Sequence, residues 1–263
     1  MEVLTPRSLA EALRAKAERP DAVPIEGGTD VMVELNFDRR RPDALLNLNE
    51  VRELKGFSRE NGSLRLGAGL TYAELMEPPL CDLLPALAEA ARTVGSPQIR
   101  ARGTIGGNLG TASPAGDALP PLLVEGAEVE LASERGTRRL AVESFLVGPK
   151  RNALEPDELI AAVHVEPGGQ PQTFMKVGPR NAMVIAVTSL AVVADREREE
   201  VRAAFGSAAP VATLVRVPLA EASSLPDAVV EAARPIDDVR STAEYRRHAL
   251  GVLARRALAR VLA

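Results

Sequence analysis

The sequence predicts an α+β protein of two domains. Short apolar strands and short helical segments alternate up to residue 165, and longer strands followed by helices come after that point. Between the two parts, residues 167–171 read Pro-Gly-Gly-Gln-Pro, a stretch dense in residues that break helices and strands. With 263 residues, of which 46% are hydrophobic, the chain is long enough to form two domains with buried cores.

The composition argues against several classes of function. A net charge of -4, 3% aromatic residues and no tryptophan are a poor match to a nucleic-acid-binding protein. Cys81 is the single cysteine, so the chain can form no internal disulfide and cannot hold a cysteine-ligated iron–sulfur cluster by itself. His164 and His248 lie far apart without other ligands nearby, and we interpret both as structural rather than metal-binding.

We expect a cytoplasmic location and no membrane span. The sequence contains no apolar run long enough to cross a bilayer. Its first residues lack the basic and then apolar layout of a secretory signal peptide.

The first part of the chain combines one clear helix with short strands. Ser8 followed by Glu11 is typical of a helix N-terminus, and small apolar residues recur behind it at helical spacing. A short apolar strand over residues 22–25 runs directly into a turn rich in glycine, residues 26–31, which we call the glycine turn. A helical pattern then begins at Asp30, and another short strand is expected over residues 44–48.

The glycine turn has two interpretations. A strand, a glycine turn and a helix start form the layout in which main-chain amides bind a phosphate. The other interpretation is a plain tight turn. The turn lacks the spaced glycines of a dinucleotide-binding Rossmann motif, so these residues alone do not decide between the two.

The next part of the chain, up to residue 167, is expected to contain hairpin-like strand pairs and short helices. Residues 54–70 alternate like a hairpin, Thr71 is placed to cap a short helix, and a longer helix is expected after Asp82. Apolar alternation then predicts strands over residues 127–132, 138–142 and 159–165.

The most unusual stretch runs from Val94 to Leu122, and we call it the glycine-rich stretch. Small hydroxyl and amide side chains separate its glycines, and it contains one carboxylate, Asp117. Glycine allows positive φ and lets another molecule approach the main chain, and consecutive amides in a loop bind anions. We therefore predict that this stretch is a loop that forms the floor of a cofactor site. Its glycines include Gly95, Gly103, Gly106, Gly107 and Gly110.

Beyond the linker, a small sheet and a layer of helices are expected. A strand is predicted over residues 173–177, and residues 201–206 are predicted to be the partner strand of the apolar and small-residue run 183–193, with the charged residues 195–200 as a solvated hairpin end. Two or three helices should follow Pro210. The last begins at Thr242 and is amphipathic, with Tyr245, Ala249, Val252, Leu253 and others on one side and arginines on the other.

These motifs resemble a known family. Residues 104–108, followed by residues 111–114 and Asp117, look like the flavin-binding signature of molybdenum hydroxylases, which include xanthine dehydrogenase and aerobic carbon monoxide dehydrogenase. Residues 94–100 and 27–30 are similar to the same family and occur in its order and spacing. The resemblance continues past the linker in the segments 176–180, 206–210 and 243–247.

The resemblance implies a fold and a cofactor. Residues 1–167 would form a vanillyl-alcohol-oxidase-type (PCMH-type) FAD-binding domain, with subdomains over about 1–52 and 53–167 that hold FAD non-covalently. Residues 172–263 would form the family's C-terminal domain, a small antiparallel sheet plus helices. Molybdopterin and two [2Fe–2S] clusters would lie on partner chains. The lone cysteine also argues against the 4-hydroxybenzoyl-CoA reductase branch, whose flavin subunit carries an extra cysteine-bound cluster.

The resemblance also implies roles for particular residues. Main-chain amides of the glycine turn would face the FAD pyrophosphate from one side, and the signature beginning at Thr104 would face it from the other. Ser113 and Asp117 would bind the ribityl or ribose hydroxyls. The full implied set for FAD is Gly27, Gly28, Thr29, Asp30, Val31, Val94, Thr104, Gly107, Asn108, Ser113, Asp117, Ile160 and Lys176. No metal-binding or catalytic side chain is implied, because the flavin carries the chemistry.

The resemblance implies specific roles for three members of this set, and one neighbour departs from the family pattern. Val94 and Ile160 match positions that pack on the ring systems. Lys176 matches a family lysine near the flavin carbonyl edge, where a cation would stabilise the anionic reduced flavin, although a surface lysine in a strand is the alternative. Glu26 departs from the family pattern, which has a small apolar residue there, and a carboxylate beside a phosphate site is unfavourable unless it points away.

The function implied is electron transfer within a larger enzyme. FAD would take electrons from the [2Fe–2S] clusters of a small subunit, beside a molybdopterin-binding large subunit, and pass them to NAD+, a quinone or oxygen. The expected assembly is a dimer of heterotrimers. Two alternatives stay open: a stand-alone flavin oxidoreductase of the same fold, and a binding module that has lost FAD.

Overall fold

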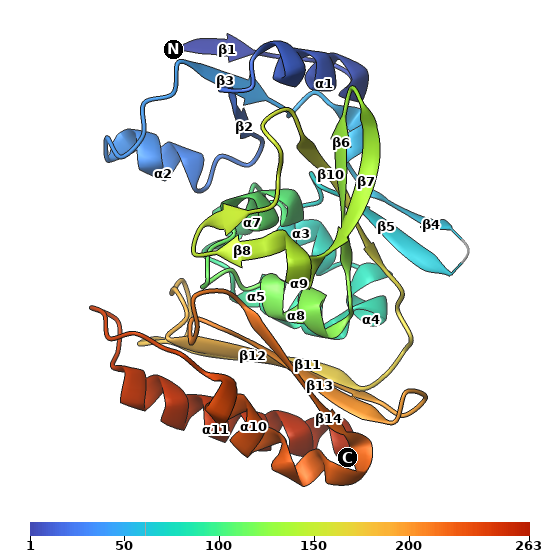
Figure 1. Ribbon diagram of the computed structural model, residues 1–263, viewed down its shortest axis with the longest axis vertical. Helices are drawn as coiled ribbons and strands as arrows, with labels where there is room; N and C mark the ends of the chain where they lie inside the picture. The colour runs from blue at the N-terminus through green and yellow to red at the C-terminus, as the bar shows by residue number, and fades with distance from the viewer. Residues whose placement is uncertain (61) are drawn as a thin grey trace.

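The described residues form four sheets, of which one pairs only two short strands; the three larger sheets follow one another along the chain and along the long axis of the molecule (Figure 1). The structure is a computed structural model that describes residues 1–60 and 62–263. The first sheet lies at one end, the second in the middle and the third at the other end. The three sheets correspond to the three segments into which we divide the sequence, and the domain boundaries themselves stay a prediction.

The first sheet is small and parallel. Its strand order is β1 (Glu2–Leu4), β3 (Ala44–Asn47) and β2 (Val23–Ile25). Helix α1 (Leu9–Glu18) connects β1 to β2 and begins as predicted, with the Ser8 hydroxyl accepting from the Glu11 amide. The short helix α2 (Val31–Asn36) follows the glycine turn and buries none of its side chains.

The second sheet is antiparallel, and its centre is the most apolar strand of the domain. The strand order is β4 (Phe57–Glu60), β5 (Ser63–Gly67), β10 (Leu159–Val165), β6 (Glu128–Ser133) and β7 (Gly136–Ala141). Every residue of β10 is buried, and all of them are apolar except His164, which lies against Glu130. The remaining elements of this part are η1 (Arg52–Leu54), α3 (Tyr72–Leu75), α4 (Leu80–Leu83), α5 (Pro85–Thr93), α6 (Pro97–Arg100), α7 (Ile105–Thr111), α8 (Leu119–Val124), α9 (Val142–Phe145), β8 (Leu146–Gly148) and β9 (Arg151–Asn152).

The third sheet packs on both faces. It contains β11 (Gln172–Val177), β12 (Thr188–Asp195), β13 (Glu200–Gly206) and β14 (Thr213–Pro218) in sequence order. One face, including Ala191 and Ala204, joins the hydrophobic core of the second part. The other face is covered by α10 (Leu225–Ala232) and α11 (Ala243–Leu262), with η2 (Leu219–Ser224) leading into α10 (Figure 1). Sharing a core in this way fixes the third sheet against the second part of the chain.

Two sequence expectations for secondary structure and one for burial were wrong in these parts of the chain. The segment after Pro210 forms the edge strand β14 before any helix: residues Thr213–Pro218 pair with β13, and their β-branched threonine and valines favour a strand. The helix expected after Asp82 is two helices: Asp82 lies in α4, and α5 begins at Pro85, a residue suited to a first helical position. Arg246 was expected on the solvent side of the last helix but is 1% exposed.

Among the described residues, none of the helices is long and apolar enough to cross a membrane.

Candidate functional site

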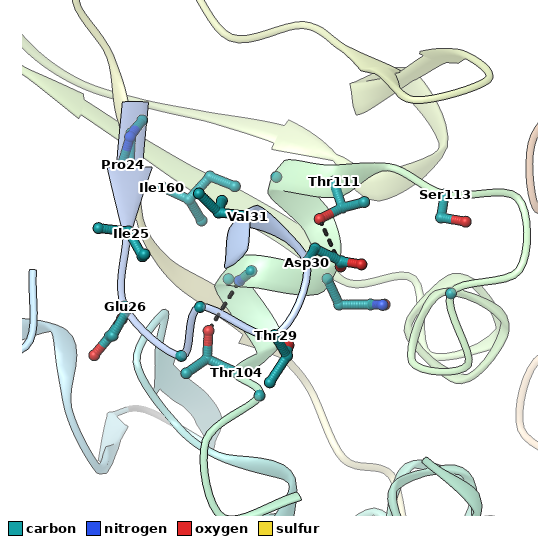
Figure 2. Close-up of a pocket in the computed structure, with 18 of the residues that line it drawn as sticks. Pro24, Ile25, Glu26, Thr29, Asp30, Val31, Thr104, Thr111, Ser113 and Ile160 are labelled. Carbon is teal, nitrogen blue, oxygen red and sulfur yellow. Dashed lines mark hydrogen bonds between the residues drawn. The ribbon is translucent and has the colours of Figure 1, made fainter. Parts of the chain in front are cut away.

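One large cavity brings the glycine turn and the glycine-rich stretch together. It has a volume of about 690 Å³, which is within the usual range of small-molecule and cofactor sites. All three parts of the chain contribute to its wall. Of the thirteen residues predicted to bind FAD, every one except Lys176 lines this cavity. Figure 2 shows the glycine turn on one side and the Thr104 and Thr111 segment on the other.

The glycine turn can adopt its shape only with glycine at two positions. A Cβ atom at Gly27 would lie 2.0 Å from the carbonyl oxygen of Arg102, so the main chain passes too close for any side chain. Gly28 has a φ of +72°, a conformation that favours glycine. Among the hydrogen bonds of the described residues, the main-chain N–H groups of residues 27–31 donate none. Five successive free amides at a cavity wall are suited to binding an anion.

The signature segment of the glycine-rich stretch is a helix, so the expected loop was wrong there. Residues Ile105–Thr111 form α7, and the hydroxyl of Thr104 caps it by accepting from the Gly107 amide at 3.0 Å. Gly106 is required for packing, because a Cβ there would lie 2.6 Å from that of Ala68. The local sequence suggests a loop, but close packing of the helix on β5 and its extension outweighs the low helix propensity of glycine.

The helix changes which groups of the signature can bind a ligand. The amides of Ile105 and Gly106 donate to the carbonyls of Leu70 and Ala68, and the Asn108 amide donates to Thr104. Together with the capped Gly107 amide, all four amides at the start of α7 are therefore engaged inside the protein. The signature presents side chains to the cavity instead, and Asn108 is the one whose buried oxygen, Oδ1, has no hydrogen-bond partner.

Asp117 is a second buried acceptor in the residues that line the cavity, and one of its carboxylate oxygens has no hydrogen-bond partner. Its Oδ2 accepts from Lys176 Nζ at 2.5 Å and from the Thr93 hydroxyl at 3.5 Å, whereas Oδ1 has no partner. Burial raises the pKa of the Asp117 carboxyl, and the Lys176 ammonium opposes this rise. An oriented carboxylate with one unused oxygen is suited to accept a hydrogen bond from a ligand hydroxyl.

Lys176 lies behind Asp117 rather than in the cavity wall. It extends from β11 of the third sheet, its side chain is 6% exposed, and it also donates to the carbonyl of Thr93 at 3.3 Å. This placement excludes a surface lysine. The role near the flavin carbonyl edge that the resemblance implies for Lys176 stays a prediction.

Glu26 points away from the free amides of the glycine turn. Its carboxylate occupies the space above Gly69, where a Cβ would meet Oε1 at 2.2 Å, and Figure 2 shows the side chain on the opposite side from Asp30. It also lines a smaller cavity of about 300 Å³ together with Lys55 and Arg102. Burial raises the pKa of Glu26 to about 7, while Lys55 and Arg102 lower it and Glu74 adds to the rise.

Apolar side chains from the second and third parts of the chain complete the wall. Ile160 is 9% exposed and approaches Gly110, where a Cβ would be 3.7 Å from its Cδ1. Val184 and Ile185 reach the cavity from the segment between β11 and β12. The sequence analysis missed these two residues, although an apolar pair after the break at residues 178–182 is a signal that could have located them.

Polar contacts join the two sides of the cavity. The Thr111 hydroxyl donates to the Asp30 carboxylate at 3.0 Å, as Figure 2 shows, and Lys150 pairs with Glu34 at 3.2 Å. These contacts tie α2 and the residue that precedes it to the second part of the chain.

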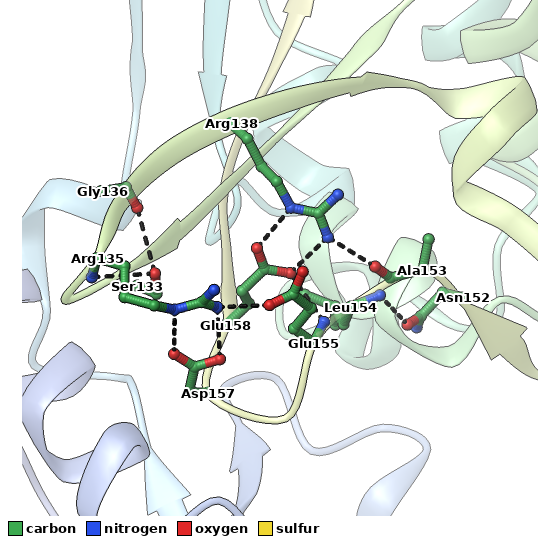
Figure 3. A network of polar contacts seen from close by, with 10 residues as sticks. All are labelled: Ser133, Arg135, Gly136, Arg138, Asn152, Ala153, Leu154, Glu155, Asp157 and Glu158. Atoms are coloured by element: carbon green, nitrogen blue, oxygen red, sulfur yellow. Dashed lines mark hydrogen bonds and ion pairs between the residues drawn. The ribbon is translucent and has the colours of Figure 1, made fainter.

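A network of arginines and carboxylates supports another section of the wall (Figure 3). Arg138 forms two hydrogen bonds to Glu158, of 2.6 and 2.8 Å, and donates to the Ala153 carbonyl at 2.9 Å. Arg138 lowers the pKa of Glu158, which lines the cavity. Nearby, Arg135 pairs with Asp157 at 2.8 Å and with Glu155 at 2.6 Å. The network therefore holds the segment 153–158 against the cavity.

The remaining predicted features are consistent with structural roles. His164 Nε2 lies 2.5 Å from Glu130 Oε2, and Arg65 pairs with the same carboxylate at 2.9 Å. Within residues 1–60 and 62–263, no group of three or more His, Cys, Asp or Glu side chains could hold a metal ion.

Comparison with known proteins gives concordant results. A family model described as the FAD binding domain in molybdopterin dehydrogenase matches residues 1–167. The xanthine dehydrogenase FAD-binding subunit of Escherichia coli O157:H7 is 31% identical over 97% of this chain and 94% of its own length. The nicotinate dehydrogenase FAD-subunit of Eubacterium barkeri is 36% identical over 71% of this chain and 66% of its own. A chain of the carbon monoxide dehydrogenase of Hydrogenophaga pseudoflava superimposes with a TM-score of 0.92 at 25% identity, covering 100% of this chain and 97% of that one.

The fold and these matches define an α+β flavoprotein of the FAD-binding type that the sequence predicted. The chain belongs to the family of FAD-binding subunits of molybdopterin dehydrogenases, which are components of multi-subunit oxidoreductases.

Proposed function

We propose that this chain is the electron-transfer flavoprotein of a three-subunit molybdenum hydroxylase. In this proposal, electrons arrive from [2Fe–2S] clusters on a small subunit, a large subunit holds the molybdopterin, and the electrons leave to NAD+, a quinone or oxygen. FAD would supply reversible one- and two-electron chemistry. The observation that carries the proposal is the row of five free amides in residues 27–31, at the wall of a cavity whose size suits a cofactor.

The residues of the cavity fit FAD by their chemistry. Free amides of the glycine turn can neutralise a pyrophosphate without a lysine, with the Asn108 side chain on the facing wall. The unpaired oxygens of Asn108 and Asp117 are acceptors that lack a protein partner, and ribityl or ribose hydroxyls are donors that would satisfy them. Ser113 lines the same wall, while Val94 and Ile160 offer apolar contact for rings.

Lys176 is proposed to serve the site through Asp117. Because its ammonium lies 2.5 Å from that carboxylate, it keeps Asp117 oriented and favours the ionised form, which accepts hydrogen bonds most strongly. No side chain is assigned a proton-transfer step, since this chain binds and orients the cofactor and excludes water from it.

The proposed assembly is a dimer of heterotrimers in the cytoplasm. Light scattering of the complex, purified after co-expression with the neighbouring genes, would give its mass and test this arrangement.

Flavin binding is tested first. The chain is produced alone and with the neighbouring genes, and absorbance between 350 and 500 nm, roughly the flavin range set by the cofactor itself, is recorded before and after adding FAD. We expect a flavin spectrum under at least one condition. If no flavin copurifies and none rebinds, the proposal fails, and a binding module without FAD becomes the better description.

Electron transfer is tested on the flavin-loaded chain. The flavin is reduced anaerobically with dithionite, and its reoxidation by NAD+, a quinone or oxygen is followed in a stopped-flow instrument. We expect rapid reoxidation by at least one acceptor. Steady oxidation of a small alcohol by the isolated chain would instead favour the stand-alone oxidoreductase.

A further inference from the structure

A buried arginine outside the cavity links the C-terminal domain to the cofactor site. Arg246 lies in the first turns of α11, is 1% exposed, and is among the largest fully buried side chains. It donates from Nη1 to the carbonyls of Val187 and Ser207, at 2.8 and 2.6 Å, and from Nη2 to Asp238 at 2.6 Å. A buried guanidinium is costly to desolvate, so its position calls for a reason beyond helix packing.

Its first partner, Val187, closes the segment that reaches the cavity. The Val187 amide donates to the Val177 carbonyl at 2.8 Å, which pins the base of residues 178–187 at the ends of β11 and β12. This segment carries Val184 and Ile185 to the cavity wall. The bond from Arg246 to the Val187 carbonyl therefore holds the end of the segment that carries these two apolar side chains.

Its second partner, Ser207, contacts the glycine-rich stretch directly. The Ser207 amide donates to the Pro114 carbonyl at 2.7 Å, and Ser207 holds this position with a left-handed φ of +60°. Pro114 follows Ser113, and residues 115–117 after it line the cavity up to Asp117. Nη1 of Arg246 therefore holds two main-chain positions at strand ends of the third sheet. One is Val187, beside the segment that reaches the cavity, and the other is Ser207, which contacts Pro114.

We propose that Arg246 is a positioning residue that sets how the C-terminal domain closes on bound FAD. The inference rests on the proposed function. Arginine suits this role because its planar fork reaches two carbonyls and a carboxylate at once, whereas the single ammonium of lysine cannot reproduce that geometry. Asp238 completes the arrangement, and it is itself held by Arg240 at 2.6 Å.

The test compares FAD binding by matched variants of the full chain. Arg246→Lys keeps the charge but loses the fork, and Arg246→Met removes both. Asp238→Asn keeps both carbonyl bonds, and Arg256→Met changes an exposed arginine of the same helix. FAD affinity is measured by fluorescence titration, and the environment of the flavin ring is measured by visible circular dichroism. The melting temperature of the apo chain reports whether each variant is folded.

We expect Arg246→Lys to weaken FAD binding on the order of 10- to 100-fold and to change the visible dichroism. The reason is that residues which orient a binding site from behind typically affect affinity by this factor. Its apo melting temperature should stay close to that of Asp238→Asn, and both Asp238→Asn and Arg256→Met should bind FAD like the wild type. Wild-type affinity and dichroism in Arg246→Lys would overturn the inference. The inference would also be overturned if FAD affinity fell only in proportion to a loss of folded protein.

A measurement on the wild type keeps the inference testable if both Arg246 variants fail to fold. Hydrogen exchange with and without FAD should show added protection in residues 178–187 and 205–208. Absence of added protection there would contradict the inference. A wild-type chain that binds no FAD would contradict the proposed function itself, whereas FAD binding unaffected by Arg246→Lys contradicts only the role of this arginine.

Discussion

Replacing Glu26 by Gln removes a carboxylate that lies directly behind the free amides of the glycine turn. The side chain is largely buried above Gly69, and burial raises its pKa to about 7. Lys55 and Arg102 oppose that rise, but no hydrogen bond or ion pair satisfies the carboxylate among the described residues. Glutamine has the same shape as the protonated acid, so the substitution changes charge with little change in packing.

The effect on stability depends on pH in a defined direction. The pKa of Glu26 is 4.5 in the unfolded chain and about 7 in the folded one. Between these values the folded chain binds more protons than the unfolded chain, so stability falls as pH rises through this window. Linkage gives a cost of about 1 kcal/mol at pH 5 and about 3 kcal/mol at pH 8.

The Glu26→Gln variant should therefore gain about 3 kcal/mol in the free energy of unfolding at pH 8 and about 1 kcal/mol at pH 5. Urea denaturation of the apo chain at the two pH values measures both gains. FAD titration should show tighter binding by the variant, more so at pH 8, because the ionised carboxylate repels the pyrophosphate. Glu50→Gln, at an exposed position nearby, is the control and should change neither quantity. Equal gains at both pH values, or none, would refute the reasoning.

Two further substitutions test the cavity itself. Gly27→Ala places a Cβ 2.0 Å from the Arg102 carbonyl oxygen, so it should lower the free energy of unfolding by about 1–3 kcal/mol and weaken FAD binding. The control is Gly148→Ala, whose Cβ would have its nearest neighbours 3.7 Å away and which should be far less destabilising. Thermal melts and FAD titrations compare the two variants. Asp117→Asn leaves the buried Lys176 ammonium unpaired and should cost about 3–5 kcal/mol, with a loss of FAD retention. A double variant that also replaces Lys176 by Met should recover part of the stability but not the flavin, and full recovery of both would contradict a binding role for Asp117.

Much of the architecture follows from local sequence. The Ser8 cap of α1, the Thr71 capping box of α3 and the apolar run of β10 are local signals that the structure confirms. The α+β fold class and the family followed from motifs that are each short and continuous in the sequence, although they are spread along the whole chain. These features depend on spacing and capping, which neighbouring residues determine almost alone.

The arrangement around the cavity was decided by contacts between distant residues. Local propensity argued against a helix at residues 105–111, yet packing of Gly106 on Ala68 produces one and engages the amides that a loop would have left free. The burial of Arg246 and the Lys176 pair with Asp117 join residues tens of positions apart. No periodicity in one segment can indicate such partners, because the free energy of a buried charge depends on which groups the whole fold brings beside it.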